Sequence, residues 1–241
     1  MGSSGCYALV VEGHDDKFLI NALLCANGFK RPTSGLFGTT SHSEDTPPPF
    51  VLVRDEWERD SALQIHVAQG FPEIKTTVKT LINPDSIRAL AIVADMDLHD
   101  DNRWSSIQSW LRERGFSKVP ASVPSASLVH AEPGLPVLGI WLMPDNLSEG
   151  MAETFAGQLV HADDEGWQHA TNVVTGLPDT VRRFRPDRDH HKALLHTWLA
   201  WQEEPGCKTG EAVKKGLLVA QAPPAQAFVG WIDRWLAESG K

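Results

Sequence analysis

The sequence contains few cysteines and no long apolar run, and both absences exclude classes of protein. Its 241 residues include three cysteines, Cys6, Cys25 and Cys207, and none of them belongs to a Cys-x-x-Cys pair. This argues against a disulfide framework and against a thiolate zinc site. No apolar run reaches the ~18–20 residues that a membrane-spanning helix needs, and residues 1–5 lack the features of a secretory signal. We therefore expect a cytoplasmic protein without a membrane partner.

Several catalytic signatures are also missing. There is no Gly-x-x-x-x-Gly-Lys-Ser/Thr loop, so we do not expect this chain to hydrolyse ATP by itself. There is no His-Glu-x-x-His zinc motif and no Gly-x-Ser-x-Gly nucleophile elbow. The sequence therefore points away from ATPases, zinc proteases of that type and serine hydrolases.

Positive charge is scarce. The chain has 22 lysines and arginines against 31 acidic residues, a formal net charge of -9. Because nucleic-acid binding depends mainly on cations that face phosphates, that function requires a local basic surface. The densest basic segment is residues 182–192, and its arginines are Arg182, Arg183, Arg185 and Arg188. We hypothesise that they contact a nucleic-acid backbone and that Phe184 stacks on a base. The alternative is a solvated loop partly paired by Asp187 and Asp189.

Apolar periodicity predicts alternating strands and helices up to about residue 160. Strands are expected at residues 7–11, 62–67, 87–94 and 137–143. Helices are expected after Asp15 and at residues 72–82, 104–114 and about 150–160. Strands that alternate with helices imply parallel βαβ units joined by right-handed crossovers. We therefore predict an α/β fold with a mostly parallel, Rossmann-like sheet flanked by helices.

Two segments depart from this alternation. Residues 28–49 are rich in Gly, Ser, Thr and Pro, which predicts a surface loop inserted into the core. Beyond residue 160 the pattern is mostly helical, at residues 165–174, 190–202, 211–218 and 225–237. We expect a core over residues 1–160 and a helical C-terminal extension, residues 161–241, packed on it. Helical spacing predicts core positions for Trp198, Trp201, Trp231 and Trp235.

Carboxylates follow three of the predicted strands. These are Glu12, the Asp95/Asp97 pair and Asp145. Ligands of parallel sheets bind beyond the carboxyl ends of the strands, and two-residue spacing would let Asp95 and Asp97 lean to the same side. Mg²⁺ and Mn²⁺ prefer such oxygen ligands, and they neutralise the charge that develops in phosphoryl transfer. The alternative for each aspartate is a helix cap or a turn former.

The residues around these carboxylates resemble a known family. The strand-ending run Val10-Val11-Glu12-Gly13-His14-Asp15-Asp16, with a later strand that ends in Asp-x-Asp, is similar to the TOPRIM fold of topoisomerases, bacterial primases, recombination proteins and OLD-type nucleases. Residues 139–151 and 196–206 resemble a poorly characterised bacterial TOPRIM-like family related to the OLD nucleases. The resemblance spans most of the chain outside residues 28–49.

This resemblance implies roles for individual residues. Glu12 would bind metal or act as a general acid or base, and Asp16 would support the same Mg²⁺ or Mn²⁺ ion. Asp95 and Asp97 would hold the metal. Glu153 stands where related nucleases carry an acidic residue at the start of a helix; complementing the helix N-terminus is its alternative role. The remaining position is Lys192, which would steady the transition state unless it is a surface charge.

The implied activity is metal-dependent hydrolysis of phosphodiester bonds in DNA or RNA, with water as the nucleophile. TOPRIM topoisomerases require a tyrosine from a separate region, and the single tyrosine here, Tyr7, lies in the first predicted strand. Because OLD-type nucleases pair this fold with an ATPase, a separately encoded ATPase partner in phage defence is also implied. The alternative function is a non-catalytic nucleic-acid-binding or assembly module. The oligomeric state stays open, with a homo-oligomer as one option.

Overall fold

A computed structural model describes residues 6–32, 49–57, 61–82, 87–98, 102–123 and 128–240 of the chain. Its centre is a six-stranded sheet with the order β2-β3-β1-β4-β6-β5. The four inner strands are parallel to one another: β1 (Cys6–Val11), β3 (Ala62–Val67), β4 (Ile87–Asp95) and β6 (Val137–Met143). This confirms the predicted mostly parallel sheet, and the inner strands fall at the expected positions.

Both edge strands are antiparallel and were not predicted. They are β2 (Phe50–Leu52), which pairs with β3, and β5 (Leu128–His130), which pairs with β6. Each has three residues, too few for an alternating pattern to stand out from the flanking turns. β2 follows the predicted loop at residues 28–49. Of that loop, residues 33–48 lie outside the described ranges, and Lys30 forms an antiparallel bridge with Val53.

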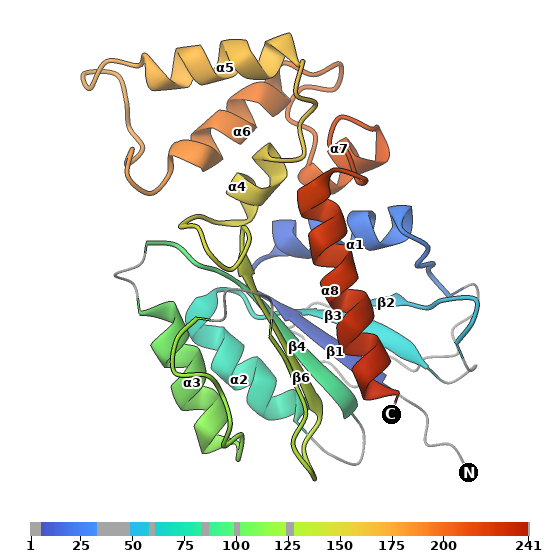
Figure 1. The fold of residues 1–241 in the computed structure, drawn as a ribbon. Coiled ribbons are helices and arrows are strands. Elements are labelled where there is room, and N and C mark those ends of the chain that lie inside the picture. The colour runs from blue at the N-terminus through green and yellow to red at the C-terminus, as the bar shows by residue number, and fades with distance from the viewer. Residues whose placement is uncertain are drawn as a thin grey trace.

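Helices cover both faces of the sheet, and strand alternation divides the core accordingly. On one face lie α1 (His14–Ala26) and α8 (Pro223–Ser239), and on the other lie α2 (Phe71–Leu81) and α3 (Arg103–Glu113) (Figure 1). In β1, Leu9 and Val11 face the first layer, whereas Val10 faces the second. Because both faces are covered, polar side chains of these strands are left to the sheet edges and ends.

The C-terminal part of the chain occupies two places. α8 packs on β6 and β4, and its Trp231 and Trp235 belong to the same apolar cluster as the sheet. α7 (Thr209–Lys214) packs on α1. In contrast, α5 (Glu165–Thr175) and α6 (His190–Ala200) pair with each other above the end of the sheet, joined to it through α4 (Ala152–Gly157) (Figure 1). The proposed division at residue 160 remains a prediction.

Trp201 is the tryptophan for which the core prediction was wrong. Its relative exposure is 46%, whereas Trp198, Trp231 and Trp235 are fully buried. The reason is that α6 ends at Ala200, so Trp201 stands at the cap and leaves the helix face that its spacing implied. Its ring lies 5.6 Å from that of His169. None of the helices in the described ranges is both long enough and apolar enough to cross a membrane.

We expect Trp235→Ala to lower the free energy of unfolding by about 3–5 kcal/mol, because it empties a large core position. Trp235 also donates its indole N–H to the Val137 carbonyl over 3.1 Å and lies where a side chain at Gly139 would collide with it. Trp201→Ala is the matched control and should cost less than about 1 kcal/mol. Urea denaturation of both variants tests this, and equal losses would contradict the packing described here.

Candidate acidic site at the end of the sheet

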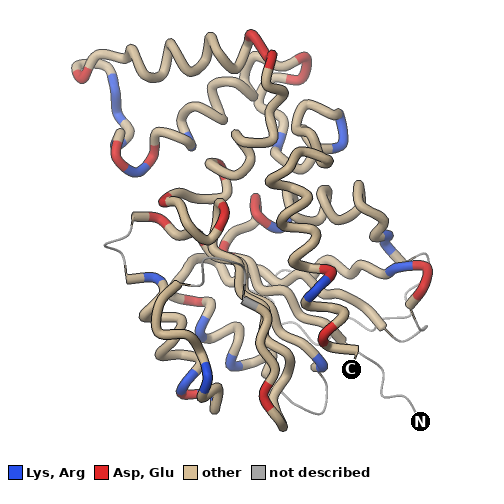
Figure 2. The backbone as a smooth tube through the Cα atoms, viewed as in Figure 1, with Lys and Arg blue, Asp and Glu red and all other residues tan. Residues whose placement is uncertain are grey.

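Acidic side chains gather where the parallel strands end. Glu12 follows the last residue of β1, and Asp95 is the last residue of β4, the neighbouring strand. Asp16 lies in the first turn of α1, and Glu153 in the first turn of α4. Figure 2 shows acidic residues concentrated in this region, between the sheet and the upper pair of helices. Four carboxylates from three separate parts of the chain thus meet at the carboxyl end of the sheet.

Asp95 connects the strand ends to α4. Its Oδ1 accepts a hydrogen bond from the Ala152 backbone N–H over 2.9 Å. Its own backbone N–H donates to Glu12 Oε2 over 3.4 Å, a long contact. The carboxylate of Asp95 therefore stands between Glu12 and the start of α4, with one of its oxygens already bonded.

Glu12 and Asp16 are held by backbone donors. The Phe71 N–H, at the start of α2, donates to the Glu12 carboxylate. The Gly13 N–H donates to Asp16 Oδ2 over 2.7 Å, so Asp16 caps the first turn of its own helix. Both carboxylates are partly buried. These bonds fix the two side chains close to the end of β1.

Withdrawal from water and mutual repulsion disturb the ionisation of this cluster. Burial raises the pKa of Asp95 well above its ordinary value, and the charges of Asp16, Glu12 and Glu153 raise it further. Burial likewise raises the pKa of Asp16 to about 7, with a contribution from Glu153 and Glu12. The pKa of Glu12 is raised by burial and partly offset by the positive charge of Arg103. The cluster as it stands lacks enough positive charge to stabilise all its carboxylates ionised.

Lys192 supplies one compensating charge from the upper helices. Its Nζ lies 3.2 Å from Glu153 Oε1, which joins α6 to α4. The Glu153 side chain is largely buried, whereas that of Lys192 is about half exposed. The neighbouring Glu153 raises the pKa of Lys192, and Asp95 and Asp15 add to that effect. The sequence-predicted Glu153 and Lys192 are therefore brought together beside the strand-end carboxylates.

Asp97 lies beyond the end of β4, so strand alternation does not set the direction of its side chain. β4 ends at Asp95, and Asp97 has a left-handed φ of 54°, so the alternation of a strand does not continue to it. Its backbone instead pairs with Gly150 through bonds of 2.8 and 3.0 Å. Its carboxylate forms an ion pair with Arg103. A metal-ligand role for Asp97 would require it to leave this partner.

Arg103 is the residue of this region that sequence reasoning missed. It is the first residue of α3, its side chain is largely buried, and its guanidinium lies 4.0 Å from the centre of the Phe71 ring. It thereby joins Asp97 to the α2 end that holds Glu12. The signal in the sequence was an arginine six residues after Asp97, close enough to pair with it. Residues 99–101, between the two, lie outside the described ranges.

Asp145 is engaged in the turn that follows β6. Its Oδ1 accepts from the backbone N–H groups of Leu147 and Ser148 over 2.9 and 2.7 Å, and its Oδ2 accepts from the Ser148 hydroxyl over 2.9 Å. Burial would raise the pKa of Asp145, but these hydrogen bonds outweigh it and hold the pKa below its ordinary value. Its geometry is that of a turn former, the alternative noted from the sequence.

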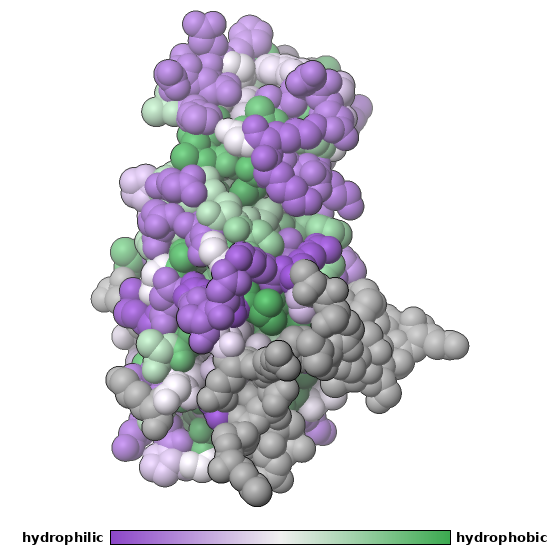
Figure 3. Space-filling model, turned by 90° about the vertical axis from the view of Figure 1, so that its right-hand side faces the viewer, coloured by the Kyte–Doolittle hydropathy of each residue, from purple (hydrophilic) through white to green (hydrophobic). Residues whose placement is uncertain are grey.

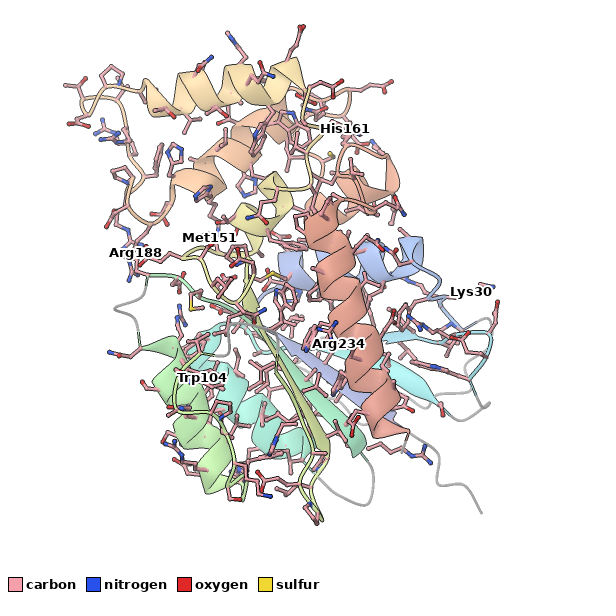
Figure 4. The ribbon with its side chains drawn as sticks, viewed as in Figure 1. Lys30, Trp104, Met151, His161, Arg188 and Arg234 are labelled. Atoms are coloured by element: carbon pink, nitrogen blue, oxygen red, sulfur yellow. The ribbon has the colours of Figure 1, made fainter. Side chains whose placement is uncertain are left out.

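The arginines of residues 182–188 are placed differently from one another. Arg182 pairs with Asp179, and Arg185 pairs with Asp189 over 3.2 Å. Arg183 is exposed, and the predicted stacking residue Phe184 is partly buried against the core. Arg188 lines a cavity of about 210 Å³ between the α5–α6 connection and the core. The other lining residues include Asp97, Glu149, Met151 and His191. Figure 4 shows Arg188 on the α5–α6 connection, close to Met151 on the segment that leads into α4.

The donor atoms of the cluster suit a hard cation, although they are not assembled around one. Within the described ranges, no three His, Cys, Asp or Glu side chains converge closely enough to form a ready metal-binding group. Asp95 and Asp16 each give one oxygen to a backbone N–H, and Glu153 is paired with Lys192. Mg²⁺ and Mn²⁺ nevertheless prefer carboxylate oxygens as ligands, and these carboxylates have few cations beside them. Binding would require local rotation of these side chains.

Together these features define an α/β protein with a mostly parallel sheet and a carboxylate cluster beyond its strand ends. The chain belongs to the family described as "Protein of unknown function (DUF3226)", whose model matches residues 7–237. Its fold is similar to the crystal structure of the hypothetical protein PH0156 from Pyrococcus horikoshii OT3, with a TM-score of 0.54 and 18% sequence identity. That likeness covers 98% of this chain and 95% of the other, and it concerns the fold alone. Comparison with curated proteins gives no match.

We expect Asp16→Asn to stabilise the protein in buffer without divalent cations, increasingly so as the pH rises. The pKa of Asp16 is about 7 when folded, against an ordinary 3.8. Between these values the folded state holds a proton that the unfolded state has released, so ionisation costs stability as pH rises. The melting temperature should therefore exceed that of the parent by about 2–4 °C at pH 8, with little difference below pH 3.8.

Asp145→Asn is the matched control for this measurement. The lowered pKa of Asp145 means that its ionised form stabilises the fold, so its loss should lower the melting temperature at pH 8. A melting temperature of Asp16→Asn that falls below that of the parent at pH 8, as expected for Asp145→Asn, would show that the Asp16 environment is not short of positive charge.

Proposed function

We propose that this protein hydrolyses phosphodiester bonds of DNA or RNA at the acidic site, in a divalent-metal-dependent reaction of the TOPRIM type. The observation that supports this most is the meeting of Glu12, Asp16, Asp95 and Glu153 at the carboxyl end of the sheet. A divalent cation would offset their mutual repulsion and stabilise their ionised forms despite partial burial. Phosphoryl-transfer sites use such cations to neutralise developing negative charge.

Glu12, Asp16 and Asp95 are the residues that we assign to Mg²⁺ or Mn²⁺, with Glu153 as a neighbour held by Lys192. When bound, such an ion supplies Lewis-acid polarisation of a phosphoryl oxygen and neutralises developing negative charge. The chain contributes the position of these carboxylates, fixed by backbone donors at Gly13, Asp95 and Ala152. Asp97 and Asp145 are left out of this assignment, since their carboxylates have other partners.

Glu12 and Lys192 are proposed for the proton transfer and the charge stabilisation. The raised pKa of Glu12 brings it closer to neutral pH, which suits a group that takes a proton from water. Lys192 presents a positive charge beside Glu153, from a helix above the strand ends, where it would steady a phosphoryl group. Tyr7 is 7% exposed within the sheet and packs against Trp57 and Trp235. Water is therefore the proposed nucleophile.

Two features extend the proposal to substrate and partner. Arg188 lines the cavity beside Asp97, so it can meet a nucleic-acid backbone, together with the exposed Arg183. The lack of an ATP-binding loop, together with the resemblance to OLD-type nucleases, supports a separately encoded ATPase as partner in phage defence, with the cytoplasm as the site of action. A non-catalytic binding module is the competing function, favoured by the absence of a ready metal-binding group within the described ranges.

Cleavage with Mn²⁺ separates the two functions. Parent protein and Asp95→Asn are incubated with labelled single-stranded and duplex DNA and RNA. Loss of Asp95 should reduce the cleavage rate by more than roughly 100-fold, because even outer partners of a metal site contribute about 10–100-fold. Asp163→Asn changes an exposed aspartate outside the cluster and should cleave as the parent does. Equal residual cleavage by the parent and Asp95→Asn would favour the binding module.

A second measurement addresses Lys192. We expect Lys192→Gln to lower kcat by about 100-fold or more while KM changes little, if its charge acts mainly in the transition state. Lys79→Gln, at an exposed position in the last turn of α2, is the control. A rise in KM with unchanged kcat would instead assign Lys192 to ground-state binding.

A further inference from the structure

Two phenylalanines and three cations form a patch on the side of α1 that carries α7. Phe18 in α1 and Phe50 in β2 contact edge to face, with ring centres 5.3 Å apart. Lys17 Nζ lies 4.3 Å and Arg31 Cζ 4.7 Å from the centre of the Phe50 ring. Lys208 Nζ, at the start of α7, lies 5.3 Å from the centre of the Phe18 ring. We call these five residues the ring patch.

The cations of the ring patch have no acidic partner within the described ranges. Neither a hydrogen bond of the side chain nor an ion pair connects Lys17, Arg31 or Lys208 to a carboxylate there. Burial lowers the pKa of Lys17, and no neighbouring acid offsets that effect. In a chain with a net charge of -9, this differs from Arg182 and Arg185, which both pair with aspartates. The ring patch is therefore a local positive surface.

The accessible members of the patch are Arg31 and Lys208. Both are exposed, whereas Lys17 is 4% exposed and the two rings are partly buried. Arg31 lies against Phe50, so its guanidinium can present its outer plane to a flat group while its N–H groups remain available for phosphate. Figure 3 shows the side of the molecule toward α7, where hydrophilic residues form a belt interrupted by apolar areas.

The patch is next to the acidic site along α1. Lys17 and Phe18 directly follow Asp16, and successive side chains of a helix point in directions about 100° apart. Asp16 faces the carboxylate cluster, so the patch lies around the helix from it. A chain that contacts the patch can therefore reach the strand ends without crossing the sheet.

We propose that the ring patch binds a single nucleic-acid strand and guides it to the acidic site. This rests on the proposed function for the identity of the polyanion. Arg31 and Lys208 would meet successive phosphates, and an unpaired base would stack on the Arg31 guanidinium plane. A duplex keeps its bases stacked inside, so it can make the phosphate contacts but cannot stack a base on Arg31. The patch therefore favours single strands over duplexes.

The test measures binding without cleavage, in buffer with EDTA. Parent protein, Arg31→Ala/Lys208→Ala and the control Lys79→Ala/Lys118→Ala are titrated against a labelled single strand of about 16 nucleotides, a length that one binding unit can cover. The control removes the same charge from exposed lysines on the α2 and α3 side of the sheet. Melting temperatures establish that both double variants are folded.

We expect the Arg31/Lys208 variant to bind the single strand roughly 100-fold more weakly, since each of the two lost charged contacts is worth about tenfold in affinity. Its plot of log affinity against log salt should be shallower by about 1.4, which is 0.7 for each of two lost phosphate contacts on a single strand. The control variant should bind as the parent does. The preference of the parent for single strand over duplex should shrink in the Arg31/Lys208 variant.

Unchanged affinity and salt slope in the Arg31/Lys208 variant would overturn the inference, and so would binding of heparin but of no nucleic acid by the parent. The cleavage assay separates this from the proposed function. A parent that binds single strands through Arg31 and Lys208 but cleaves nothing supports the patch and removes the nuclease. A parent that cleaves, with a variant that binds equally well, supports the nuclease and removes the patch.

Discussion

Like charges that are partly withdrawn from water need a positive charge nearby, and this constraint organises the centre of the molecule. Burial and mutual repulsion act together on Asp16, Asp95 and Glu12, and each has a raised pKa. Lys192 and Arg103 provide positive charge near these carboxylates. Lys192 comes from the upper helices and pairs with Glu153, while Arg103 comes from the opposite helical layer and lowers the pKa of Glu12. Among the described residues, neither Lys192 nor Arg103 forms an ion pair with Asp16 or Asp95, so these two carboxylates are the least compensated of the cluster.

The gathering of these carboxylates follows from the sheet. In neighbouring parallel strands the carboxyl ends coincide, and β1 and β4 pair directly, so residues after them must be neighbours. The faces of both strands are occupied by apolar side chains packed under helices, and polar residues are excluded until the strand ends. The same apolar constraint places α8 against the sheet and leaves α5 and α6 beyond its end, where α6 can carry Lys192 toward Glu153.

The sequence predicted those parts of the site that depend on strand ends and helix turns. Glu12 and Asp95 were identifiable because each terminates a strong apolar run, whereas Asp16 was named only through the resemblance to TOPRIM proteins. The inner strands and the mostly parallel sheet were predictable for the same reason. The direction of the Asp97 side chain could not be predicted from its spacing, because two-residue alternation holds only inside a strand and β4 ends before Asp97, whose backbone is left-handed. The ion pair of Arg103 with Asp97 depends on how α3 approaches the sheet, which no local pattern contains.

Which surface cations have carboxylate partners was the property hardest to predict from the sequence. Residues 182–188 were the densest basic run, yet density along the chain does not reveal whether the charges are neutralised, and Arg182 and Arg185 have carboxylate partners. Lys17, Arg31 and Lys208 are scattered in sequence, and only the packing of α1, β2 and α7 brings them around two rings. A polyanion responds to charge that remains unpaired in space. For an acidic chain, the location of unpaired cations is therefore more informative about nucleic-acid binding than the number of cations in any stretch.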